Sequence, residues 1–359
     1  MNLFVLDLST AEGQSEYRRV LQTMNVDHPY YKGEFLDTFY DGLERARAFV
    51  LNDDTGEAVV VMPVYIRPIE ASPGGITYYD SISTWGYSGP LLANNSEISV
   101  LCHFWSVVDR WYQENQVISE FIRFNLTGNH RFYSGTVVPG MHNIKGRIIE
   151  PDMIWKNYVH KVRTNIRRAR KVGLTVKICH RTISEEEFKA FYKIFKHTLD
   201  RNNAETIYYH PSDKLKTFIR NNPESCLIAL TLKDNIPIAA ELVLISKDTI
   251  YGFIGGTLAE YFPLRPNEIL KHEVIRWAVN NKKRYYVLGG GYGYDDGIFR
   301  YKKSFFPGDI IDFQTGRKII DQEIYSKLSG IDYLEYRIDK DFFPLYRKCR
   351  VPYKDLHLK

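Results

Sequence analysis

The 359-residue sequence is poor in the features that mark disulfide-bonded, metal-binding and membrane-spanning proteins. Its four cysteines form no CxxC pair and stand near no histidine at ligand spacing, so neither a disulfide framework nor a zinc site follows. No apolar stretch approaches the roughly 18 residues that cross a membrane, and the N-terminus lacks the basic region and cleavage site of a signal peptide. The sequence therefore predicts a cytoplasmic protein without a metal or a tightly bound cofactor.

Motifs for nucleophilic catalysis and for nucleotide binding are also missing. The chain has no GxSxG elbow, no P-loop of the form GxxxxGK[ST], and no GxGxxG at the start of a helix. The candidate general bases are Asp80, Glu241 and His210, and their spacing does not choose among them. A buried Glu241 would have a raised pKa and could accept a proton from an attacking amine, but a structural pair with an arginine fits equally.

Composition and length are those of a globular protein with two domains. Apolar residues make up 44% of the chain and charged residues 25%, and the net charge is only +5. We place the domains at residues 1–145 and 146–345, followed by a tail at 346–359. Aromatic residues reach 14%, with 26 tyrosines, which suits the walls of a polar-ligand groove as well as an ordinary core.

Apolar periodicity and turn residues predict an α/β fold. The first half contains a strand hairpin, a helix and a strand, at residues 48–52, 58–67, 97–114 and 121–126. The second half contains helices at 155–172, 184–201, 211–220 and 267–280, and strands at 175–180, 226–232, 236–245, 249–254 and 285–288. Short turns join the three strands between 226 and 254, so that part of the sheet is antiparallel. The similar order of elements in the two halves suggests internal duplication.

The strongest local signal is a basic helical segment at residues 156–171. Seven of its sixteen residues are Lys or Arg, and none is acidic. Arg163 and Arg167 stand four residues apart on one helix face, which suits bidentate capture of a phosphate or of an RNA backbone. A solvated helix whose cations favour its C-terminal end is the alternative.

Two loops and the segment around His210 contain further candidate substrate contacts. Gly290 and Tyr292 belong to a glycine-rich loop after the strand at 285–288, where the backbone can approach a ligand or only turn. Tyr87 lies in an aromatic loop at 78–90 that could hold a sugar or peptide, or only seal a cleft. Tyr208, near His210, is a further candidate.

Taken in order, several segments resemble the Fem-type peptidoglycan aminoacyltransferases and the related GNAT-like proteins of polysaccharide gene clusters. The segments are WGYSGP at 85–90, the basic run at 161–173, residues 191–202, residues 264–270, and the glycines at 289–291 with residues 299–305. The resemblance implies tandem GNAT-like domains, each with a mixed, largely antiparallel sheet flanked by helices. It also implies an acceptor in the cleft between the two domains.

The activity that the resemblance implies is amide formation on an amine of a phosphate-bearing envelope precursor. That precursor is a nucleotide- or lipid-linked one, either of peptidoglycan or of a surface polysaccharide with an amino sugar. Arg163, Arg167, Lys32 and Tyr87 correspond to acceptor contacts. Lys302 and Lys303 correspond to the basic position near the transfer site. Glu241 is the third catalytic candidate, and Asp80, Tyr208, His210, Gly290 and Tyr292 are further candidate substrate contacts.

Two departures leave the donor open between acyl-CoA and aminoacyl-tRNA. The helical arm that several Fem proteins use for tRNA has no counterpart, because no long coiled-coil insertion is present. The acyl-CoA loop of ordinary GNAT enzymes is also missing before the helix at 267–280. The expected partners are the precursor and tRNA, with at most transient contact to a membrane surface. A non-catalytic GNAT-like module that binds envelope glycan or RNA is the alternative function.

Overall fold

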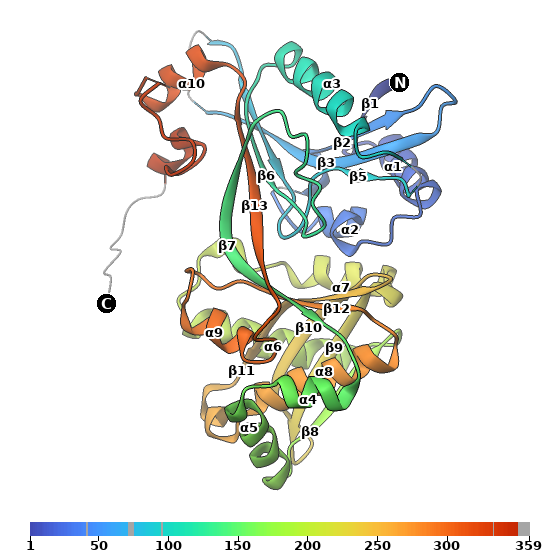
Figure 1. The fold of residues 1–359 in the computed structure, drawn as a ribbon, viewed down its shortest axis with the longest axis vertical. Coiled ribbons are helices and arrows are strands. Elements are labelled where there is room, and N and C mark those ends of the chain that lie inside the picture. Colours follow the sequence, from blue (N-terminus) through green and yellow to red (C-terminus); the bar gives the residue numbers. More distant parts are fainter. Residues whose placement is uncertain (41, 71–74, 95, 333, 351–359) are drawn as a thin grey trace. The chain divides into compact units, whose positions relative to one another are not determined.

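The computed structural model describes residues 1–40, 42–70, 75–94, 96–332 and 334–350, and these form two compact units (Figure 1). Unit 1 contains residues 1–26, 39–140 and 313–359, and unit 2 contains residues 27–38 and 141–312. Each unit is thus assembled from separate segments, whereas the predicted domains were continuous. Of the predicted tail at 346–359, residues 351–359 lie outside the described residues.

Unit 1 is built on a mixed sheet with the strand order β1-β2-β3-β4-β6-β13. Its elements are β1 (Asn2–Asp7), α1 (Ala11–Thr23), β2 (Ala46–Asn52), β3 (Ala58–Pro68), β4 (Tyr79–Ser83), β5 (Leu91–Leu92), α3 (Val100–Glu114), β6 (Val117–Arg123), the second half of β13 (Ile310–Ile319) and α10 (Gln322–Ser329). Leu101, Phe104 and Val108 of α3 are fully buried in a core with β2 and β3. The helix begins later than predicted, which leaves Ile98 outside it and 39% exposed.

Unit 2 has the strand order β7-β12-β11-β10-β9-β8. Its elements are α2 (Gly33–Leu36), the second half of β7 (Thr136–Arg147), α4 (Pro151–Asn157), α5 (His160–Lys171), β8 (Thr175–His180), α6 (Glu185–Arg201), α7 (Ser212–Asn221), β9 (Cys226–Lys233), β10 (Ile236–Ile245), β11 (Thr249–Thr257), α8 (Pro266–Asn280), β12 (Tyr285–Gly289) and α9 (Gly297–Lys303). The predicted antiparallel order of β9, β10 and β11 is confirmed.

The core of unit 2 follows from the predicted apolar faces. Tyr158, Val162 and Ile166 are buried against the sheet together with Leu270 and Val274 of α8. α6 packs on β10 and β11, and it begins with the predicted capping box of Ser184 and Glu187.

The two units repeat one arrangement of elements. In unit 1 the parallel strands β4 and β6 are joined by α3, and in unit 2 the parallel strands β11 and β12 are joined by α8. The strand that follows β6 is β7, and its second half pairs with β12 in unit 2. β13 comes after β12 and α9, and its second half pairs with β6 in unit 1. The suspected duplication is therefore visible in the element order, with the final strands exchanged.

Some predicted elements differ from the structure. The helix expected at 155–172 is two helices, because Tyr158 and Val159 are extended between α4 and α5. The strand expected at 121–126 runs from Val117 to Arg123. β4 lies inside the expected loop at 78–90, and the expected boundary at 139–145 is part of β7. In both places glycine and polar composition concealed a strand, and for β7 the partner β12 is also distant in sequence.

Among the described residues, none of the helices has the length and apolar character needed to cross a membrane.

Candidate active site

The candidate site lies where the parallel strands β11 and β12 part. Their register joins three residue pairs, from Thr249 with Tyr285 to Tyr251 with Val287, while β11 runs on to Thr257. On its other side β11 pairs with β10, and a bulge shifts that register at Phe253. The pairing of β11 with β12 thus involves only the first part of β11.

A buried polar cluster lies in the sheet beside the point where β11 and β12 stop pairing. Glu241 of β10 is 6% exposed, and its carboxylate accepts hydrogen bonds from Lys271 Nζ of α8 and from the Tyr286 hydroxyl of β12, the latter at 3.2 Å. Gly252 of β11 leaves room for the carboxylate, because a Cβ there would lie 2.6 Å from Glu241 Oε1. The geometry matches the structural ion pair that the sequence left open, with a lysine in place of an arginine.

Lys302 of α9 is the candidate catalytic cation of this site. Its Nζ donates a 2.6 Å hydrogen bond to the carbonyl oxygen of Gly290, just beyond the end of β12. Burial lowers the pKa of Lys302 to about 8, and the positive charge of Lys271 adds to this effect, whereas Glu241 and Asp296 oppose it. Lys302 is therefore a half-buried ammonium group whose proton is held less tightly than usual.

The glycine-rich loop is folded around a carboxylate of the chain itself. Asp296 caps α9 by accepting from Phe299 N at 2.7 Å, and it also accepts from the backbone N–H of Tyr292 at 2.6 Å and of Gly293 at 3.1 Å. A Cβ on Gly291 would lie 2.1 Å from Asp296, so only glycine fits there. These amides are thus engaged within the loop, while the Tyr292 side chain is 78% exposed.

Residues 27–38 bring Lys32 into unit 2. Tyr30 and Phe35 flank Lys32 in the sequence, and their rings lie 6.2 Å and 5.5 Å from the ring of Phe253 on β11. His210 stacks on the same ring at 5.8 Å. Burial lowers the pKa of His210 to about 4, which makes it neutral near pH 7.

Three predicted substrate residues belong to unit 2. His210 stacks on Phe253, Lys32 lies on the segment whose Phe35 ring contacts Phe253, and Tyr208 lies two residues before His210 in a short 3₁₀ turn. Lys303 follows Lys302 at the end of α9 and is half-buried.

The predicted pair of phosphate-binding arginines is not assembled as a clamp. The Arg163 guanidinium donates to the carbonyl oxygens of Trp155 at 3.4 Å, of Lys156 at 2.9 Å and of Tyr158, and so caps the end of α4. Arg167 instead lies over the Trp155 ring, 5.5 Å from its centroid. The carbonyl groups at the break between α4 and α5 need donors, and this explains why Arg163 turns away from solvent.

Asp80 and Tyr87 lie in unit 1. Asp80 is 1% exposed and is held by Arg67 Nε and Arg347 Nε, each at 2.8 Å, and by the Tyr346 hydroxyl at 3.2 Å. This carboxylate is occupied by two arginines and the Tyr346 hydroxyl. Tyr87 is 8% exposed and packs edge-on against Phe313.

Residues 159–303 are similar to a known protein family. A family model described as an acetyltransferase (GNAT) domain matches residues 159–303, which contain β8 to β12 and all of the Lys302 cluster. This part of the chain is therefore similar to a GNAT domain. None of the curated proteins compared with the chain matches it.

Solved structures share the fold of the GNAT domain and of the whole chain. A crystal structure of FemX superposes with a TM-score of 0.64 at 13% identity, covering 91% of this chain and 99% of FemX. The C-terminal domain of a putative lysylphosphatidylglycerol synthetase from Agrobacterium fabrum gives 0.58 at 11% identity, covering 86% and 91%. L-PGS from Bacillus licheniformis gives 0.55 at 10% identity, covering 86% and 92%. The expected α/β fold is thereby confirmed, and it is similar to the fold of FemX.

Proposed function

We propose that the GNAT domain transfers an acyl or aminoacyl group to an amine of a phosphate-bearing cell-envelope precursor and so forms an amide. One observation carries the proposal. The half-buried ammonium group of Lys302 donates to the carbonyl oxygen of Gly290, just beyond the end of β12, and its pKa is lowered to about 8. The match of residues 159–303 to a GNAT acetyltransferase family model supports acyl transfer as the reaction at this site.

The reaction needs a cation at the acyl carbonyl. The amine nitrogen attacks the carbonyl carbon, and the carbonyl oxygen becomes an oxyanion that accepts a hydrogen bond from Lys302. As the tetrahedral intermediate collapses, the C–S or C–O bond to the donor breaks, and the proton that the attacking nitrogen loses passes through water to the leaving sulfur or ribose oxygen. Lys271 holds Glu241, so this carboxylate orients the cluster and does not act as the base.

The acceptor is proposed from the cations of unit 2 and from the names of the similar structures. Lys32 remains available as a phosphate contact near Phe253, whereas Arg163 is engaged with backbone carbonyls. FemX and the lysylphosphatidylglycerol synthetases carry the fold, and this favours a nucleotide- or lipid-linked precursor. The donor is acyl-CoA or aminoacyl-tRNA, and we place the reaction in the cytoplasm with transient contact to the membrane surface.

The test is mass spectrometry of reactions that pair acyl-CoA and aminoacyl-tRNA pools with nucleotide-linked and lipid-linked amino-sugar acceptors. Wild-type protein is expected to add one acyl mass to an acceptor. Lys302→Met should lower kcat by about 10²–10³, the usual loss when an oxyanion donor is removed. Lys282→Met, an exposed lysine of unit 2, is the matched control and should retain most of the activity. Salt-sensitive RNA or glycan binding without any acyl transfer would favour the non-catalytic alternative.

A further inference from the structure

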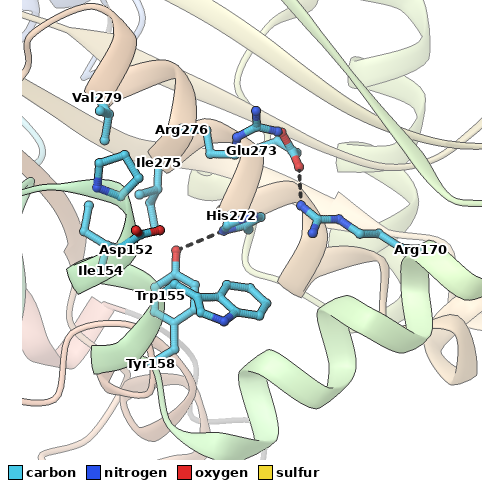
Figure 2. Close-up of a pocket in the computed structure, with 11 residues that line it drawn as sticks. Asp152, Ile154, Trp155, Tyr158, Arg170, His272, Glu273, Ile275, Arg276 and Val279 are labelled. Atoms are coloured by element: carbon cyan, nitrogen blue, oxygen red, sulfur yellow. Dashed lines mark hydrogen bonds and ion pairs between the residues drawn. The ribbon is translucent and has the colours of Figure 1, made fainter.

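Apart from the Lys302 cluster, unit 2 contains a cavity that is formed by α4, the α4–α5 junction, α5 and the C-terminal half of α8 (Figure 2). Its volume is about 630 Å³, and small-molecule sites typically have ~300–1,000 Å³. Lys271 and His272 are neighbours on α8, but Lys271 joins the Glu241 cluster while His272 lines this cavity. Consecutive helical residues point about 100° apart, so α8 presents one residue to each site.

The floor of the cavity is polar and uncharged. Tyr158 is 2% exposed, and its hydroxyl lies 3.3 Å from His272 Nδ1. Burial lowers the pKa of His272 to about 4, so the imidazole is neutral near pH 7. The Trp155 ring lies 5.3 Å from the His272 ring, and Ile154 and Val279 add apolar surface beside them.

One side of the cavity carries an excess of positive charge. Arg170 and Arg276 pair with the same carboxylate, Glu273, at 3.1 Å and 2.8 Å, and Figure 2 shows these three side chains in a row. The two arginine side chains are 47% and 58% exposed. A guanidinium group has five N–H donors, so a pair of them sharing one carboxylate retains donors for a second anion.

Asp152, the remaining acid of the lining, stands away from this row (Figure 2). It lies in the first turn of α4, where the backbone N–H groups and the helix dipole compensate a negative charge. The two arginines are therefore the groups that a charged ligand would meet.

We propose that this cavity binds a small amphiphilic anion. Its apolar or aromatic body packs against Trp155, Ile154 and Val279, and its carboxylate or phosphate lies on Arg170 and Arg276. The site does not depend on the transfer chemistry, because its residues are not those of the Lys302 cluster.

The probe is 2-naphthoate, and 2-naphthalenemethanol is its uncharged match. Isothermal titration calorimetry of the full chain is expected to show at least about tenfold tighter binding of the naphthoate, the usual scale of a charge-assisted pair. Arg276→Gln should remove most of this preference and leave the affinity for the alcohol unchanged. Arg284→Gln, an arginine of the same unit with its side chain 70% exposed, is the matched control.

A second variant tests the location. Val279→Trp narrows the cavity from its half-buried edge and should block both probes, while its melting temperature shows that the fold is retained. Lys302→Met should bind both probes normally, which separates this site from the proposed active site. Failure of wild-type protein to bind either probe, equal affinity for both, or naphthoate binding that survives Val279→Trp would each overturn the proposal.

Discussion

At the residue scale, the charge of Lys302 is set by its neighbours on three elements. Burial and the Lys271 ammonium lower its pKa to about 8, and Glu241 and Asp296 act in the opposite direction. The ammonium is fully present below this pH and is lost as the pH rises through it. A rate that needs the ammonium should therefore fall as the pH rises past about 8.

Lys271→Met tests this arrangement through the pH profile of kcat/KM. The substitution removes a repelling cation and leaves the Glu241 carboxylate without its lysine, and both changes raise the pKa of Lys302. The descending limb should move to higher pH. Lys282→Met, an exposed lysine of unit 2, should leave the profile in place. A limb that stays fixed or moves to lower pH in Lys271→Met would contradict the assigned role.

Asp80 offers a second residue-scale prediction, which concerns stability. Asp80→Asn leaves Arg67 and Arg347 without the buried carboxylate between them and should cost about 3 kcal/mol of unfolding free energy. Asp54→Asn, whose side chain is 89% exposed in its ion pair with the N-terminus, should cost less than about 1 kcal/mol. Urea denaturation measures both. Normal stability of Asp80→Asn with lost activity would return Asp80 to the list of catalytic candidates.

At the scale of elements, the break between α4 and α5 is held by one side chain. Arg163 donates to carbonyl groups at the end of α4, so Arg163→Ala should lower stability by about 1–2 kcal/mol and speed hydrogen exchange in α4. Arg167→Ala removes only a contact with the Trp155 ring and should change stability little. If Arg163→Ala weakens acceptor binding at unchanged stability, the phosphate contact implied by the family resemblance is correct after all.

Elements whose cause is local were predictable from the sequence. The capping box of Ser184 and Glu187 fixes the start of α6, and the turns at 233–235 and 246–248 fix the order of β9, β10 and β11. β7 was missed because its identity as a strand comes from its partner β12, which lies far along the chain. The break at Tyr158 was missed because the Arg163 side chain donates to the carbonyl groups there, and the sequence does not show that contact.

At the scale of the whole molecule, the candidate site draws on segments that the sequence separates widely. Lys302 was found only through the family resemblance, and Lys271 and Tyr286 were missed. Nothing in the local sequence marks Lys271 as different from a solvated helical lysine. Its role appears when β10, α8 and β12 bring it beside Glu241 and Tyr286. Segment 27–38 likewise joins unit 2 through tertiary contacts, among them those with β11 and α7.

The central claim is that folded unit 2 holds Lys302 as a cation with a lowered pKa. An NMR titration of the ¹³C-dimethylated protein follows each lysine, and comparison with Lys302→Met assigns its signal. The account predicts an apparent pKa near 8 for Lys302, which rises when Lys271→Met is introduced. A titration at the ordinary value of 10.5, unchanged by Lys271→Met, would contradict it.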